Sequence, residues 1–167
     1  MDDRAALGRA ILLMMGGIIL QTTVINRLQE PFFGFSPNLV VVLTILSARW
    51  VHPRAALLLG FTAGLFLDLL GGGILGLRAL VLTTVAYAAV RATSELPLRS
   101  IVGVWPISLL AEVVLFVVGT LAGRGTLLQA ELLQRSIVVP LLNLVLAAVL
   151  FPLLARVLKP RERRIPL

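Results

Sequence analysis

A few polar side chains interrupt the apolar segments of this chain, and their types are those that could do chemistry. Asp68 lies in GFTAGLFLDLL, Glu112 in LLAEVVLF and Asn143 in LLNLVL, while Gln21 and Arg78 stand near the edges of two other apolar runs. Two carboxylates could act as a general acid and a general base. Ionisable residues within apolar segments are by default candidates for a functional site.

The rest of the composition narrows this chemistry. The chain has no cysteine and a single histidine, His52, so it lacks thiolate nucleophiles, disulfides and a second imidazole to share a metal ion. No nucleophile accompanies Asp68 and Glu112, and nothing in their spacing requires an acid–base pair. We therefore expect no enzyme, and with it no catalytic residue, no cofactor and no metal site.

The composition is that of a membrane protein. Hydrophobic residues make up 59% of the 167 residues and charged residues only 14%, with a mean hydropathy of +1.02. A soluble domain has about 25% charged residues. The net charge of +7 would suggest nucleic acid in a soluble protein, but here the basic residues flank apolar runs. We expect an all-α polytopic membrane protein, one integral membrane domain over residues 1–167, that contacts the lipid bilayer and no nucleic acid.

Six apolar segments are candidates for transmembrane helices, each of which needs about 20 mostly apolar residues. Together they predict a six-transmembrane-helix bundle. The second segment is short, so it could be tilted, broken or re-entrant. The predicted spans are residues 5–25, 37–50, 54–70, 74–90, 101–122 and 136–158.

The distribution of basic residues predicts the orientation. Of the 15 Lys and Arg residues, all but Arg27, Arg78, Arg124 and Arg135 fall on the same side of this arrangement as the two termini. The positive-inside rule then places both termini in the cytoplasm.

In that orientation one group of polar residues falls in the outer half of the membrane, where it could form a pocket open to the outside. Either a structural network that joins helices or a functional site would explain the group. Its members are Gln21, Asp68, Arg78, Glu112 and Asn143.

One face of the third segment carries small residues. Gly60, Gly64 and Asp68 recur every four residues, so they share a helix face on which another helix could approach closely. An ionised Asp68 must turn away from lipid. We predict that Asp68 and Arg78, which lie at similar depth, form an ion pair or share a hydrogen-bond network.

The chain resembles the MreD family of bacterial rod shape-determining membrane proteins. The resemblance rests on the stretches FFGFSPNLVVVLTI and GFTAGLFLDLLGGGILGLRAL and on a short basic tail. The family motif maps onto residues that would serve helix packing or partner binding, with Arg78 beside them. These motif residues are Gly60, Gly64, Asp68, Gly72, Gly76 and Leu77.

The resemblance implies a non-enzymatic subunit of the cell-elongation (rod) complex in the bacterial cytoplasmic (inner) membrane. Such a scaffold binds MreC, a bitopic membrane protein, joins other elongation-complex membrane proteins, and supports cell-shape control and peptidoglycan synthesis. The implied fold is similar to the substrate-binding components of energy-coupling-factor transporters. The alternative is a solute-binding membrane component of a vitamin-type transporter. The polar cluster favours that alternative too, although few aromatic residues, 6%, could line an organic-ligand pocket.

Overall fold

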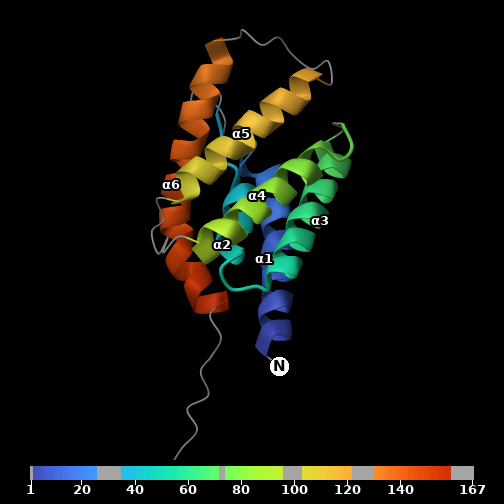
Figure 1. The fold of residues 1–167 in the computed structure, drawn as a ribbon, viewed down its shortest axis with the longest axis vertical. Helices are drawn as coiled ribbons and strands as arrows, with labels where there is room; N and C mark the ends of the chain where they lie inside the picture. Colours follow the sequence, from blue (N-terminus) through green and yellow to red (C-terminus); the bar gives the residue numbers. More distant parts are fainter. Residues whose placement is uncertain (1, 26–34, 72–73, 96–102, 122–129, 159–167) are drawn as a thin grey trace, which may run out of the picture.

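The computed structural model describes residues 2–25, 35–71, 74–95, 103–121 and 130–158, and every regular element in these ranges is an α-helix (Figure 1). Each of the six predicted segments coincides with one helix, although α1, α3, α4 and α6 reach beyond the predicted limits. The helices are α1 (Asp2–Thr23), α2 (Leu39–Ser47), α3 (Pro53–Gly71), α4 (Leu77–Glu95), α5 (Val104–Leu121) and α6 (Ala130–Leu158).

Four of the helices are long and apolar enough to cross a membrane. They provide the stretches Ala5–Thr23, Pro53–Gly71, Val104–Leu121 and Ser136–Leu158. The helix α4 is as long as α3 but more polar, because it carries Arg78, Arg91 and several threonines. The expectation of a polytopic helical membrane protein is confirmed. The expected likeness to energy-coupling-factor components stays a prediction.

The short helix α2 lies at the centre of the bundle. Its nine residues are all buried, and it contacts each of the other five helices. Nine helical residues rise about 14 Å, less than half of the roughly 30 Å of a bilayer core. The second segment is therefore a broken, protein-enclosed helix, and it does not cross a bilayer as a helix by itself.

The helices alternate in direction, so that the bundle has two distinct ends. The start of α1 and the end of α6 lie at the same end in Figure 1, which we call the terminal end. There the guanidinium Nη1 of Arg9 donates a hydrogen bond of 2.6 Å to the backbone oxygen of Val157. The ends of α1, α3 and α5 and the starts of α2, α4 and α6 lie toward the opposite end in Figure 1, which we call the distal end.

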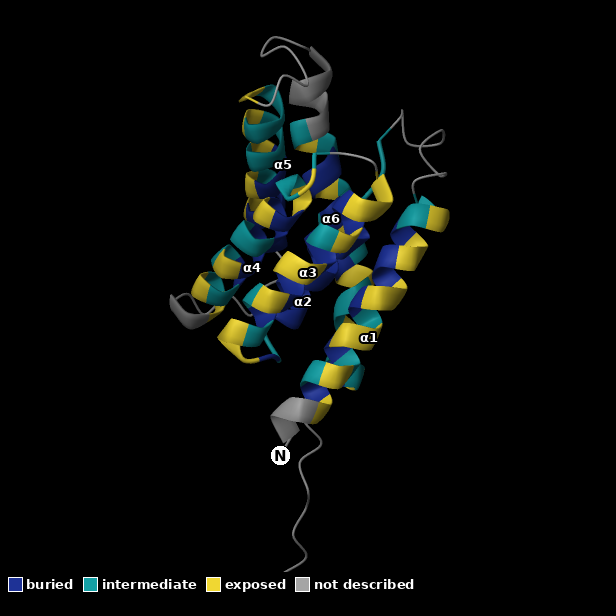
Figure 2. Cartoon of the chain, turned by 90° about the vertical axis from the view of Figure 1, so that its right-hand side faces the viewer, coloured by how far each residue is buried: buried dark blue, intermediate teal, exposed yellow. Residues whose placement is uncertain are grey.

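The outer surface of the bundle is apolar. Figure 2 shows that α1 alternates between exposed and buried faces along its length. Its exposed side chains are large and apolar, as at Leu12, which is 73% exposed, whereas Ala10 and Met14 are buried against the other helices. Such a surface is matched to lipid acyl chains rather than to water.

Candidate functional site

The small-residue face of α3 packs against α4. A Cβ atom added to Gly60 would lie 2.6 Å from the backbone oxygen of Leu82, and one added to Gly64 would fall on backbone atoms of Arg78 and Ala79. Real Cβ atoms do not approach so closely, so these glycines let the two helix backbones meet. Close backbone approach at small residues is how helices associate in lipid.

Asp68 continues this face and serves the start of α4. Its side chain is only 4% exposed, and its carboxylate accepts hydrogen bonds from the backbone N–H groups of Gly76, Arg78 and Ala79 at 2.9, 3.1 and 3.3 Å. The first N–H groups of a helix have no partner within the helix, and a carboxylate there also interacts favourably with the helix dipole. Asp68 thus caps α4 from a neighbouring helix.

Glycine at position 76 is required by the turn before α4. Its φ angle is +91°, in the region that residues with a side chain rarely adopt. This backbone conformation brings the N–H of Gly76 to the Oδ2 atom of Asp68. The turn and the carboxylate therefore act together to start α4. Gly72, another residue of the family motif, lies outside the described residues.

The side chain of Arg78 turns away from Asp68. Its Nη1 atom donates a hydrogen bond of 2.9 Å to the backbone oxygen of Leu67. The guanidinium lies over Gly71, where an added Cβ atom would come within 2.6 Å of Nη1. Asp68 and Arg78 do share a hydrogen-bond network, as predicted, but through the backbone N–H of Arg78. The two side chains form no ion pair with each other.

Side-chain amides from three parts of the chain satisfy the start of α2. The Oε1 atom of Gln21 accepts from the N–H of Leu39 at 2.7 Å, and the Oδ1 atom of Asn143 accepts from the N–H of Asn38 at 2.6 Å. Asn38 is itself the N-cap, because its Oδ1 accepts from the N–H of Val41. A helix that begins inside a membrane needs such partners, since no water is there to supply them.

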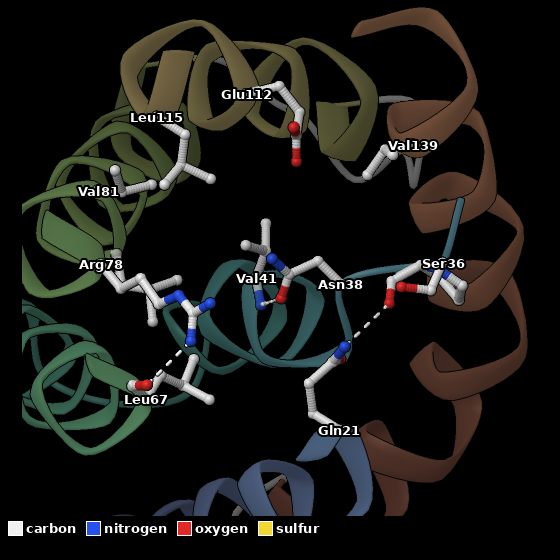
Figure 3. A pocket seen from close by; sticks show the side chains of 12 residues that line it. Gln21, Ser36, Asn38, Val41, Leu67, Arg78, Val81, Glu112, Leu115 and Val139 are labelled. Carbon is white, nitrogen blue, oxygen red and sulfur yellow. Dashed lines mark hydrogen bonds between the residues drawn. The ribbon is translucent and has the colours of Figure 1, made fainter. Parts of the chain in front are cut away.

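These two capped helix starts form part of the wall of a cavity at the distal end (Figure 3). Its volume is about 270 Å³, and all helices contribute to its lining. Figure 3 shows the guanidinium of Arg78 and the carboxylate of Glu112 pointing into the cavity from different walls. Polar and apolar side chains both line it, the polar ones being Gln21, Ser36, Asn38, Arg78 and Glu112.

The structure divides the residues predicted from the sequence into three groups. Gln21, Arg78 and Glu112 line the cavity. Asp68 and Asn143 lie behind its wall and hold the starts of α4 and α2. Asp68 and Glu112 are therefore not a catalytic pair facing one space. Gly60 and Gly64 of α3 form the third group and pack the helices together, while Gly76 belongs to the turn before α4.

The residues that the sequence argument missed include Asn38 and Gly71. Asn38 carried a usable signal, because an Asn directly before an apolar run is a typical N-cap. Gly71 carried none, since only the folded structure shows that the guanidinium of Arg78 occupies the space above it.

Comparison with known proteins supplies the family. The model of the family described as rod shape-determining protein MreD matches residues 7–160, which include every residue that lines the cavity. Comparisons with curated proteins and with solved structures each gave no match. The match covers most of the chain. The chain therefore belongs to the MreD family of rod shape-determining proteins.

Proposed function

We propose that this protein is a non-enzymatic subunit of the bacterial cell-elongation machinery that binds the transmembrane helix of an MreC-like bitopic protein. The observation that carries the proposal is the family match over residues 7–160. Through this partner the protein supports cell-shape control and peptidoglycan synthesis. Other membrane proteins of the elongation complex join the same assembly.

The partner helix must use a surface other than the glycine face of α3, because α4 already covers that face. The surface that we propose is an apolar groove of about 330 Å³ between α1 and α3. Met14 and Met15 line it from α1, and Leu58, Thr62 and Phe66 line it from α3. Methionines adapt to the shape of a partner.

The chemistry of the groove fits an apolar helix. Its one hydroxyl, that of Thr62, already donates to the backbone oxygen of Leu58 at 2.8 Å. The groove therefore presents no polar group that needs a polar partner. Helices in lipid associate by close packing of apolar surfaces of this kind.

Co-purification tests this surface. A tryptophan at Thr62 would fill the groove, and a tryptophan at Val145, which is 65% exposed on α6, changes the lipid-facing surface elsewhere. We expect Thr62→Trp to lose most of the co-purified MreC-like protein and Val145→Trp to retain it. If both variants retain the MreC-like protein, the groove is not its binding surface. If the unsubstituted protein does not co-purify with it, the proposed function is refuted. Lipid as the occupant of the groove predicts equal partner recovery from both variants.

We place the protein in the cytoplasmic membrane with both termini in the cytoplasm. Basic residues support this orientation, because Arg9, Arg54 and Arg156 all belong to helix ends at the terminal end. The chain has no cysteine, so single cysteines give clean labels. A membrane-impermeant thiol reagent added to intact cells should label Leu121→Cys at the distal end and leave Arg54→Cys unlabelled. The reverse labelling pattern would show that the two termini lie outside the cytoplasm.

A second candidate function is that of a solute-binding transporter component. The cavity at the distal end favours it, because polar groups converge on a partly apolar space there. A transporter component must carry its solute across the membrane. Vesicles that contain the purified protein and its transport partners would then accumulate the solute, whereas a scaffold would leave its concentration unchanged.

A further inference from the structure

Arg78 places a guanidinium in the distal cavity, where no ion pair joins it to a carboxylate of the described residues. Among the described residues, the guanidinium donates one hydrogen bond, from Nη1 to the backbone oxygen of Leu67. In the part of the chain that the structure describes, no Asp or Glu side chain forms an ion pair with Arg78. Because the guanidinium carries five N–H donors, most of them remain available to a ligand.

The carboxylate of Asp68 binds the backbone of α4 and does not neutralise Arg78. Both oxygens of Asp68 face the backbone at the start of α4, and the Asp68 side chain is buried there. The charge of Asp68 therefore stabilises the positive end of that helix. If the Asp68 side chain turned toward the guanidinium, several N–H groups at the start of α4 would lose their acceptor. Such a loss is costly in a membrane interior.

The cavity adds a second donor. The Oδ1 atom of Asn38 accepts from the N–H of Val41, which leaves the NH₂ group of the same amide on the cavity side. Figure 3 shows this amide and the guanidinium of Arg78 on the same side of the cavity, while Glu112 approaches from another wall. An anion would meet donors from α4 and from the start of α2.

We infer that this cavity binds a phosphate group, held by the guanidinium of Arg78 and the amide of Asn38. Arginine matches phosphate oxygens with paired N–H donors, and charge-assisted bonds of this type are the strong ones. The phosphate belongs either to a lipid headgroup that enters from the bilayer or to a soluble molecule. The volume of about 270 Å³ suits a headgroup or a small phosphorylated compound.

Three variants distinguish a ligand-binding role of Arg78 from a purely structural role. Arg78→Gln removes the charge. Gly71→Ala keeps the charge but displaces the guanidinium, because the new methyl group would take its place. Leu115→Trp fills the cavity from α5 and leaves Arg78 unchanged. The matched control is Arg156→Gln, which removes an exposed arginine near the end of α6, at the terminal end.

Thermal unfolding of the full chain in detergent, titrated with three probes, measures binding. The probes are inorganic phosphate, a short-chain phosphatidic acid, and the diacylglycerol with the same chains but no phosphate. We expect phosphatidic acid to raise the midpoint of the unsubstituted protein and of Arg156→Gln, and the diacylglycerol to raise neither. Each of the three cavity variants should weaken the apparent affinity by about tenfold or more.

The probes also identify the source of the phosphate. If inorganic phosphate and phosphatidic acid both bind, and both depend on Arg78, the site takes a soluble phosphate compound. If only phosphatidic acid binds with that dependence, the site takes a lipid headgroup. Equal binding of the diacylglycerol, unchanged binding in the cavity variants, or no binding of either phosphate would each overturn the inference. Should Arg78→Gln fail to fold, Gly71→Ala and Leu115→Trp decide it alone. The proposed binding of MreC stands or falls separately, by co-purification.

Discussion

The backbone nitrogen of Arg78 lies 3.1 Å from each carboxylate oxygen of Asp68, while its guanidinium binds the backbone oxygen of Leu67. The bond between Asp68 and residue 78 thus needs no arginine side chain. Any residue except proline at position 78 could donate it. This separation of backbone from side chain makes the roles of the two residues separable by mutation.

Substitutions at Asp68 and Arg78 should therefore act independently. Asp68→Ala removes the cap of α4 and should destabilise the protein by about 1–3 kcal/mol, because buried and partly buried N–H groups lose their acceptor. Arg78→Gln should cost less. In a double-mutant cycle measured by denaturant unfolding in detergent, the coupling energy should stay below about 0.5 kcal/mol. A larger coupling energy, or rescue of stability by exchanging the two charges, would show that the two side chains do form a direct ion pair.

Glycine substitutions should separate packing faces from lipid faces. Gly60→Ala places its methyl group against the backbone of Leu82 and should lower the thermal midpoint clearly. Gly16→Ala meets no atom within 4 Å and should be neutral or stabilising, since alanine favours the helix by about 1 kcal/mol. Equal midpoints for the two variants would show that α3 and α4 do not approach as closely as described.

Asn143 should be needed for stability rather than for ligand binding. Asn143→Leu keeps the approximate volume but leaves the partly buried N–H of Asn38 without its acceptor, at a cost of about 1–3 kcal/mol. Denaturant unfolding in detergent checks this cost, with Val145→Ala on the lipid-facing side of α6 as the control. An Asn143→Leu protein as stable as the control would contradict the capping role.

Arg9 should hold the last turn of α6. Its hydrogen bond to the backbone oxygen of Val157 joins the first and last helices at the terminal end. In Arg9→Met the apolar part of the side chain remains and this bond is lost. Amide hydrogen exchange in the last turn of α6 should then become faster, while exchange in α2 stays unchanged. Unchanged exchange in α6 would mean that other contacts suffice there.

The sequence could predict the helices and the close approach at Gly60 and Gly64, because hydropathy and four-residue spacing are local signals. It also predicted that Asp68 turns away from lipid, which the burial of that side chain confirms. The partner of Asp68 was harder to specify. The sequence shows that Asp68 and Arg78 lie at similar depth. It does not show that the backbone N–H groups at the start of α4 bind the Asp68 carboxylate in place of the guanidinium.

The cavity itself depends on contacts between distant parts of the chain. Gln21 and Asn143 converge on the start of α2, and their separation in sequence from Leu39 and Asn38 leaves no local pattern. The shortness of α2 was only partly visible, because its apolar run continues beyond the helix to Ala48 and Val51. Which residues surround a broken helix is a property of the assembled bundle.

The capping of α2 by Asn143 has a consequence for biosynthesis. The N–H group of Asn38 leaves the ribosome long before its acceptor, which follows 105 residues later. Until α6 enters the membrane, the N–H of Asn38 lacks this acceptor, although Gln21 and Asn38 itself can already cap other N–H groups at the start of α2, so α2 cannot complete its final contacts. We therefore expect the packing around α2, the central helix, to be completed last. A chain that stops short of α6 should be recognised and degraded by membrane proteases.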